Sequence, residues 1–212
     1  SFVIPFENLL AFLLAAVVII VIPGPGVLFV IGRSIALGRR AGVLSVLGNA
    51  LGNVPALLAV AFGVGAIVAS SVAAFTVIKI VGAAYLVWLG VQAIRHRHAH
   101  VRTPSNVRTS PMRLLAQGFV VGVTNPKTIA FFVAALPQFV APGAGPIWMQ
   151  LLALGLIFQV LAVVSDSLWA LAAGTARAWF ATSPRRMATL ASAGGVMMIG
   201  LGGTLAFAGA KG

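Results

Sequence analysis

Acidic residues are almost absent from this 212-residue chain, in which Glu7 and Asp166 are the only two carboxylate side chains. Charged residues make up 8% of the sequence, whereas an ordinary soluble domain carries roughly 25%. Two acids against 14 lysines and arginines cannot cover a water-facing surface with mixed charge. Cysteine is also absent, which excludes disulfides, thiolate metal sites and thiol redox chemistry. Together these absences exclude an ordinary soluble globular protein.

Apolar residues take the place of the missing charge, because they make up 60% of the chain and give it a mean hydropathy of +1.09. A helix of about 22 residues rises about 33 Å, enough to cross a hydrocarbon core of roughly 30 Å. We therefore predict an all-α integral membrane protein, with residues 1–212 as one membrane domain and no room for a soluble catalytic domain, so that we expect no enzyme activity. The six predicted transmembrane helices are Phe6–Ile31, Gly42–Ser70, Ser71–Ile94, Leu114–Val140, Ile147–Ala173 and Met187–Ala208.

The basic residues lie on one side of this topology. Eleven of the 14 lysines and arginines fall in the connections after the first, third and fifth predicted spans. Cytoplasmic loops are enriched in Lys and Arg, so these connections are expected inside and both termini outside. The net charge of +12 then reflects topology and contact with anionic lipids. Nucleic acid is not expected as a partner, because no aromatic-studded basic domain accompanies the charge.

The predicted spans divide into two three-helix halves, 1–94 and 114–212, joined by a basic cytoplasmic loop at 95–113. Halves with an odd number of crossings can repeat only with inverted topology. Proline breaks in the first and fourth spans, at similar distances from the following loop, support such a repeat. Chance agreement is an open alternative, since Gly and Pro are frequent in membrane helices.

The first break is the sequence Pro23-Gly24-Pro25-Gly26. Its prolines remove two backbone donors and crowd the carbonyls of Ile19 and Val21, so a helix cannot pass through intact. Freed carbonyls are tolerated in lipid only where protein or a wet cavity satisfies them, which places the break inside the bundle. The amides that begin at Gly26 open a half-helix whose positive end can bind a carboxylate. The alternative is a kink that serves packing alone.

The second break is Asn125-Pro126-Lys127, where Pro126 frees the carbonyl of Gly122 and places an amide and a cation beside the gap. A lysine at membrane depth is costly, by about 2.5–3.5 kcal/mol on insertion scales, and should therefore be paired or reach a cavity. The alternative is that Lys127 snorkels toward the cytoplasm.

Asp166 lies deep in the fifth predicted span, within the sequence Val-Val-Ser-Asp-Ser-Leu-Trp. An ionisable residue at this depth marks a functional site by default, and a carboxylate is a natural proton carrier. The alternatives are a structural pair with Lys127 or Lys79 and a simple hydrogen bond to Ser165 or Ser167.

Two further polar features stand out. Gly48 and Gly52 lie four residues apart, which permits close helix contact. Asn49 and Asn53 follow these glycines, and their side-chain amides need hydrogen-bond partners in lipid and could bind a polar substrate. The histidines have the spacing of a metal tract but lie among arginines that repel a dication, so we expect a solvated loop and no metal site. They are His96, His98 and His100.

Several motifs resemble the LysE/RhtB (lysine exporter/homoserine-threonine resistance) family of bacterial amino-acid exporters. The resemblance implies a six-span carrier of the bacterial inner membrane that expels amino acids or related small metabolites, driven by proton entry. From the residues themselves, we expect the two breaks and the paired amides to bind substrate and Asp166 to carry protons. The motifs are Pro23-Gly24-Pro25, Gly38-Arg39-Arg40-Ala41-Gly42, Gly82-Ala83-Ala84-Tyr85-Leu86-Val87-Trp88-Leu89-Gly90, Asn125-Pro126-Lys127 and Leu136-Pro137-Gln138-Phe139.

The chain departs from this family at two positions. Members often have Asp or Asn where Gly26 stands, and many have Asp at the position of Asn53. Both departures remove charge from the suspected site, which favours neutral zwitterionic amino acids over a cation such as lysine. A divalent-metal exporter of the same superfamily is the alternative function. We expect no cofactor, and the sequence leaves homo-oligomerisation open.

Overall fold

The computed structural model describes residues 4–64, 66, 71–96, 98, 109–176, 178–179 and 182–207, and this part of the chain is helical with no strand. Its regular elements are α1 (Phe6–Val21), α2 (Pro25–Leu37), α3 (Arg39–Ala59), the π-helical turn η1 (Val60–Val64), α5 (Val72–Arg95), α6 (Pro111–Val123), α7 (Pro126–Ala134), the 3-10 turn η2 (Leu136–Phe139), α8 (Ile147–Thr175) and α10 (Pro184–Phe207). The all-α prediction is thereby confirmed for these residues.

Two helices are long and apolar enough to cross a membrane without interruption, namely Arg39–Gly63 with 25 residues and α8 with 29. Two further crossings exist if each bent helix pair counts as one span: α1 with α2, and α6 with α7. The described residues thus support two to four spans. The six-span inverted repeat stays a prediction, although α5 and α10 are each 24 residues long.

Local sequence explains where most helices begin. Proline occupies the first position of α2, α6 and α7, where its missing N–H removes no helical hydrogen bond. Side-chain caps precede two helices, because Ser71 accepts a hydrogen bond from the N–H of Ala74 and Ser110 accepts one from the N–H of Arg113. Gly38 separates α2 from α3 with a φ of 93°, a conformation that favours glycine. The predicted turn at Ser70 lies outside the described residues.

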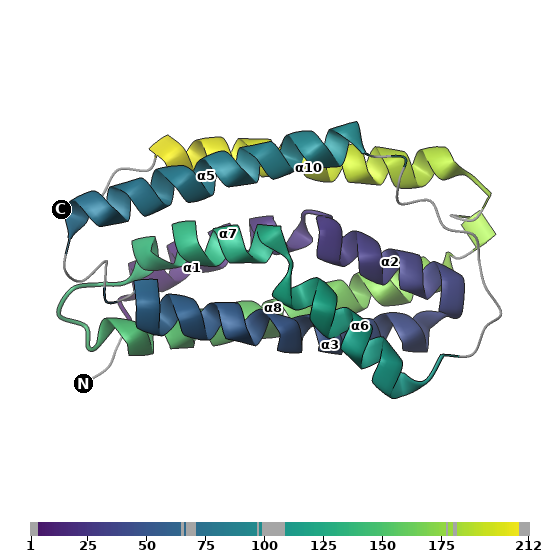
Figure 1. Ribbon diagram of the computed structural model, residues 1–212, viewed down its shortest axis with the longest axis horizontal. Coiled ribbons are helices and arrows are strands. Elements are labelled where there is room, and N and C mark those ends of the chain that lie inside the picture. Colours follow the sequence, from purple (N-terminus) through teal and green to yellow (C-terminus); the bar gives the residue numbers. More distant parts are fainter. Residues whose placement is uncertain are drawn as a thin grey trace.

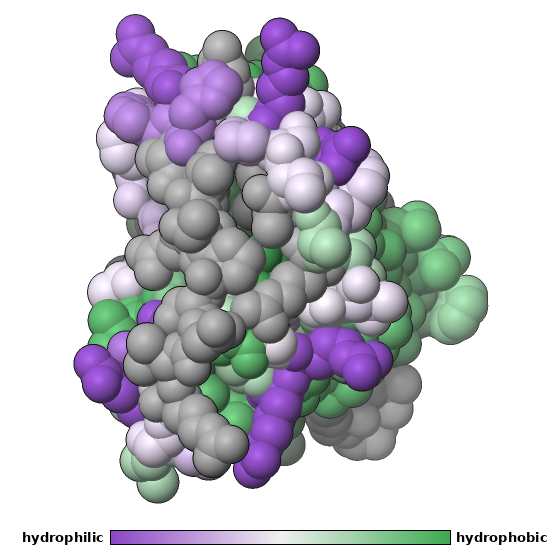
Figure 2. All heavy atoms as spheres, turned by 90° about the vertical axis from the view of Figure 1, so that its right-hand side faces the viewer, coloured by the Kyte–Doolittle hydropathy of each residue, from purple (hydrophilic) through white to green (hydrophobic). Residues whose placement is uncertain are grey.

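The helices run lengthwise between two ends of the molecule (Figure 1). The start of α1, the start of α5 and the end of α10 lie at the left-hand end in that view, and the starts of α3, α6 and α10 lie at the other. Figure 2 shows long hydrophilic side chains projecting at this second end. The helix starts there carry basic residues, as the one-sided charge predicts: Arg39, Arg40, Arg113, Arg185 and Arg186.

Large apolar side chains are exposed on the outside of the bundle, among them Leu14 on α1 and Leu156, Val160 and Leu168 on α8. An outward apolar face is what a lipid solvent requires of a spanning helix. Inside, phenylalanines from α1, α7 and α8 form the core, where the ring of Phe158 packs against those of Phe131 and Phe132. Phe158 also lines the pocket described below, so this core adjoins it.

A glycine seam joins α3 to α6. A Cβ atom added to Gly48 would lie 2.2 Å from the carbonyl oxygen of Leu115, and one added to Gly122 would lie 2.2 Å from that of Asn49. Gly52 and Gly118 make equally close backbone contacts across the same seam. The predicted close contact at Gly48 and Gly52 is confirmed, and it brings Asn49 beside the break between α6 and α7.

Candidate functional site

The two breaks bend their helices by nearly the same angle. The axis turns by 47° between α1 and α2, across residues 22–24, and by 46° between α6 and α7, across residues 124–125. The predicted interruptions of both helices are therefore confirmed. The following contacts show that the breaks also meet in space, although they lie about 100 residues apart in the sequence.

Lys127 connects the two breaks. Its ammonium group donates hydrogen bonds to the carbonyl oxygen of Ile19, at 3.0 Å, and to that of Ile22, at 2.9 Å. The residue is 5% exposed, so the alternative in which Lys127 snorkels out of the protein is wrong. A buried ammonium finds partners here because Pro23 has no N–H to offer the carbonyl of Ile19.

The second acceptor of Lys127, the carbonyl of Ile22, is not one of the two carbonyls that the prolines are predicted to crowd. It is available because α1 ends at Val21 and Ile22 enters a tight turn, in which its carbonyl also accepts the N–H of Gly24 at 2.9 Å. Gly24 is needed for a second reason, since a Cβ there would lie 2.7 Å from Cδ of Lys127.

The second break satisfies its own backbone. Asn125 caps α7 by accepting a hydrogen bond from the N–H of Lys127 at 3.2 Å. The N–H of Asn125 itself donates to the carbonyl of Gly122 at 3.0 Å, which is the carbonyl that Pro126 leaves without a helical donor. Both the cap and the lysine that follows it are buried, so α7 begins inside the protein.

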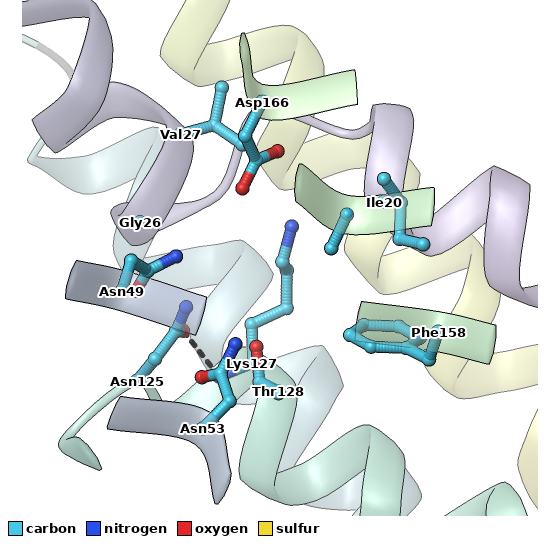
Figure 3. Close-up of a pocket in the computed structure, with 11 residues that line it drawn as sticks. Ile20, Gly26, Val27, Asn49, Asn53, Asn125, Lys127, Thr128, Phe158 and Asp166 are labelled. Atoms are coloured by element: carbon cyan, nitrogen blue, oxygen red, sulfur yellow. Dashed lines mark hydrogen bonds between the residues drawn. The ribbon is translucent and has the colours of Figure 1, made fainter. Parts of the chain in front are cut away.

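A pocket lies between the breaks and is lined by six of the ten predicted site residues (Figure 3). The other four, Pro23, Gly24, Pro25 and Pro126, form the breaks but do not line the pocket. Its volume is about 20 Å³, room for about one water molecule and not for an amino acid. The lining residues are Ile20, Gly26, Val27, Asn49, Asn53, Asn125, Lys127, Thr128, Phe158, Ala162 and Asp166.

Asp166 reaches this pocket from α8 and is 6% exposed. Its carboxylate and the ammonium of Lys127 point toward the same space in Figure 3, and the two opposite charges attract each other. Within the described part of the chain, Asp166 forms neither a direct ion pair with Lys127 nor a hydrogen bond with Ser165 or Ser167. The deep carboxylate is thus held near a cation without being locked to it.

Asn49 and Asn53 are buried on α3 beside the pocket. The side-chain oxygen of each has no hydrogen-bond partner among the residues that the structure describes. A Cβ atom at Gly26 would lie 2.8 Å from Nδ2 of Asn125 and 3.2 Å from Nδ2 of Asn49. Glycine at this position therefore lets the start of α2 approach both amides closely.

Sequence reasoning missed one polar residue next to the site, Gln159 on α8. Its Nε2 donates to the carbonyl of Ala50, and its Oε1 accepts from Nδ2 of Asn53 at 3.3 Å. Gln159 precedes Asp166 by seven residues, which places both on one face of a helix. The sequence signal that could have identified Gln159 is a single amide in an apolar span, two helical turns before Asp166.

The histidines do not join the pocket. His96 and His98 are exposed beyond the end of α5, and His100 lies outside the described residues. No group of three or more His, Cys, Asp or Glu side chains in the described ranges could hold a metal ion. The metal-exporter alternative therefore gains no ligand set from this part of the molecule.

Comparison with known proteins gives relatives along nearly the whole chain. A homoserine/homoserine lactone efflux protein from Salmonella typhimurium is 34% identical over 203 residues, covering 96% of this chain and 98% of the relative. An uncharacterized membrane protein from Vibrio cholerae is 39% identical over 200 residues, covering 94% and 96%. A leucine efflux protein from Klebsiella pneumoniae is 30% identical over 155 residues, covering 73% of each chain. No solved structure matches the chain.

These relatives are membrane and efflux proteins, and none of the three is named as an enzyme. Their names support amino-acid export, and the apolar helices support a membrane protein that crosses the bilayer more than once. The family model described as LysE type translocator matches residues 17–209, a range that contains both helix breaks and every residue of the pocket. The chain belongs to the LysE type translocator family.

Proposed function

We propose that the protein is a secondary transporter that exports neutral, zwitterionic amino acids or related small metabolites across the bacterial inner membrane, by proton antiport. The observation that supports this most directly is the charge balance of the pocket. It holds one ammonium, Lys127, and one carboxylate, Asp166, that are close enough to attract each other and yet form no direct pair in the described structure. A zwitterion carries the complementary pair of charges on one small molecule.

The proposed carboxylate subsite is the region around Lys127. An ammonium has three N–H donors, and the carbonyls of Ile19 and Ile22 use two of them. The third is free to meet a substrate carboxylate. The start of α2 adds the N–H groups of Gly26 and Val27, which have no acceptor within their own helix.

The proposed ammonium subsite lies among oxygen atoms. The carboxylate of Asp166 and the unpartnered oxygens of Asn49 and Asn53 face this part of the protein interior. The remaining pocket surface is largely apolar, with Ile20 and Phe158 among its members. An uncharged substrate side chain fits such a surface, whereas a second cationic group would find no second carboxylate.

Transport requires the pocket to open, because its present volume is far below that of an amino acid. The two breaks supply the moving parts in this proposal, since each divides a helix into halves that can tilt separately. Opening alternately to the two sides of the membrane would expose the same pocket first inward and then outward. The predicted inverted repeat of 1–94 and 114–212 would provide that alternation.

Asp166 is the proposed proton carrier. In the outward-open form it takes a proton, and in the inward-open form it releases the proton as substrate binds. Its position across the pocket from Lys127 makes its charge sensitive to how far the two side chains are separated. A change of conformation can therefore change its affinity for protons.

The proposed orientation places both termini outside and the basic end of the bundle in the cytoplasm. The observation in its favour is that arginine-bearing helix starts gather at one end (Figure 1). Because the chain has no cysteine, a single cysteine introduced at Ser105 is a clean probe. We expect an impermeant maleimide to label it in inverted membrane vesicles and not in intact cells. The opposite result would reverse the orientation.

The function is tested in inverted membrane vesicles given an outwardly acting proton gradient, with the vesicle lumen acidic. We expect radiolabelled leucine and homoserine to accumulate, lysine to compete poorly, and nickel to remain excluded. Vesicles without the protein provide the background. Accumulation of nickel without leucine would favour the metal-exporter alternative. Accumulation of leucine without a proton gradient would contradict proton antiport.

A further inference from the structure

The break between α1 and α2 presents the kind of oxygen cluster that binds a small cation. The carbonyl oxygen of Ile19, in the last turn of α1, and that of Ile22, just beyond its end, both lie within 3.0 Å of one nitrogen atom. The carboxylate of Asp166 adds negative charge nearby. Unwound backbone carbonyls at a broken membrane helix are the ligands that sodium-coupled carriers use for their ion.

In this chain the position is already filled by Lys127. Its ammonium is a compact cation that donates to oxygen atoms, and it comes from a helix in the other half of the sequence. Gly24 leaves space for the lysine stem, because a Cβ there would lie 2.7 Å from Cδ and 3.0 Å from Cε. The cation is thus supplied by the protein and held by a covalent tether.

We propose that the Lys127 ammonium is a tethered cation that permanently occupies a monovalent-cation site formed by the carbonyls of Ile19 and Ile22. The inference rests on the proposed transport function only where it concerns the coupling ion. If the protein is the proposed transporter, export proceeds without sodium or potassium. The consequence of the inference for the protein alone is that removing the lysine side chain creates a site that a free cation can enter.

The variant that tests this is Lys127→Ala, which removes three carbons and the ammonium group and keeps Cβ. Propylammonium contains the same three carbons and ammonium, so it can occupy the space that the variant creates. The matched control is Lys127→Met, which removes the charge but fills most of the same space. Sodium, potassium and ammonium test the oxygen cluster itself, and choline is a cation too large to enter.

The measurement is the Tm of the purified proteins in detergent, in choline chloride and after addition of each cation. We expect propylammonium to raise the Tm of Lys127→Ala by about 3 °C or more relative to choline. The parent and Lys127→Met should not respond. A folded Lys127→Ala whose Tm ignores every cation, or a Lys127→Met that responds equally, overturns the proposal.

Transport supplies an arm that needs no variant. In proteoliposomes, exchange of leucine by the parent should be unchanged when choline replaces all sodium and potassium, and a requirement for either ion overturns the proposal. Propylammonium should restore part of the exchange that Lys127→Ala loses. The thermal measurement uses no substrate, so the two proposals are tested separately. A parent protein that exports no amino acid would contradict the proposed function, whereas the cation site would still be decided by the Tm result.

Discussion

The two broken helices have nearly equal bends, 47° and 46°, but they are stabilised in different ways. The break before α7 is capped locally, by the side chain of Asn125 and by a hydrogen bond from its own N–H to Gly122. The break before α2 has no side-chain cap at Gly24, and the carbonyls behind it depend on Lys127 from the other break. One break is therefore independent of the rest of the chain, and the other is not.

This difference shows how two similar backbones can serve unequal chemical roles. The dependent break presents oxygen atoms and free amides to the protein interior, and the independent break presents a cation and an amide. A symmetric pair of breaks would place like groups opposite one another. The break before α7 supplies the positive charge of the pocket through Lys127, and Asp166 on α8 supplies the negative charge; the proposed substrate class depends on both.

The largest effect is expected from Lys127→Met. It leaves the carbonyl of Ile19 without its charged donor, at a cost of about 1–3 kcal/mol for a buried group, leaves that of Ile22 with the N–H of Gly24 alone, and removes the positive charge opposite Asp166. We expect the Tm to fall and leucine export in inverted vesicles to drop about 100-fold or more. Export at the parental rate would show that the dependent break does not need its partner.

Asp166→Asn tests the group that faces the shared lysine. The substitution keeps the shape but removes titration. With an imposed difference of about one pH unit, one proton per substrate supports about a tenfold gradient, because 1.36 kcal/mol corresponds to a factor of ten. In the variant we expect the ratio of leucine concentrations inside and outside the vesicles to fall to about one, while exchange of labelled for unlabelled leucine continues. A variant that still builds the parental gradient would make the acid structural.

Gly24→Ala is expected to have a smaller effect, because it changes only the space for the lysine stem. The new Cβ would meet Cδ of Lys127 at 2.7 Å, so we expect a loss of about 1–3 kcal/mol in stability and a several-fold loss of export. The matched control is Gly32→Ala on α2, where no atom lies within 4 Å of the new Cβ. It should be neutral or stabilising by about 0.5–1 kcal/mol. Equal effects at both positions would contradict the claim that Gly24 is needed to leave space for the Lys127 side chain.

The smallest effect is expected from Asn125→Ala, which removes the local cap of the independent break. Loss of an N-cap costs about 1 kcal/mol, and Pro126 still sets the bend. Ser110→Ala removes the cap of α6 in the same way but outside the pocket, so it measures capping alone. We expect similar decreases in the Tm, with a loss of export only for Asn125→Ala. A collapse of the fold in Asn125→Ala would mean that the second break is also dependent.

The sequence predicts the positions of both breaks because proline acts on its own helix. The missing N–H groups of Pro23 and Pro126 each affect a carbonyl four residues earlier, and the structure bears out both interruptions. The depth of Lys127 and Asp166 also follows from their place within apolar segments. Local rules of this kind need no knowledge of the tertiary arrangement.

The contacts across the pocket could not be predicted in the same way. Lys127 and Ile19 are separated by 108 residues, and no rule that acts within one helix brings these two segments together. The bond from Asn53 to Gln159 spans 106 residues and depends on α3 lying against α8. The six-span inverted repeat itself is still a prediction, because only two to four spans are supported by the described helices.

The long separation between Lys127 and its acceptors also orders the assembly of the protein during synthesis. The ribosome makes the N-terminal part first, so α1 and α2 enter the membrane before the residue that completes their junction exists. Until then, the carbonyl of Ile19 lacks its charged donor and must be satisfied by water or lipid headgroups. When α7 is inserted, the ammonium of Lys127 binds the carbonyls of Ile19 and Ile22, which lowers the free-energy cost of placing the lysine in the membrane. The junction of α1 and α2 thus reaches its final hydrogen bonding only after α7 has been made.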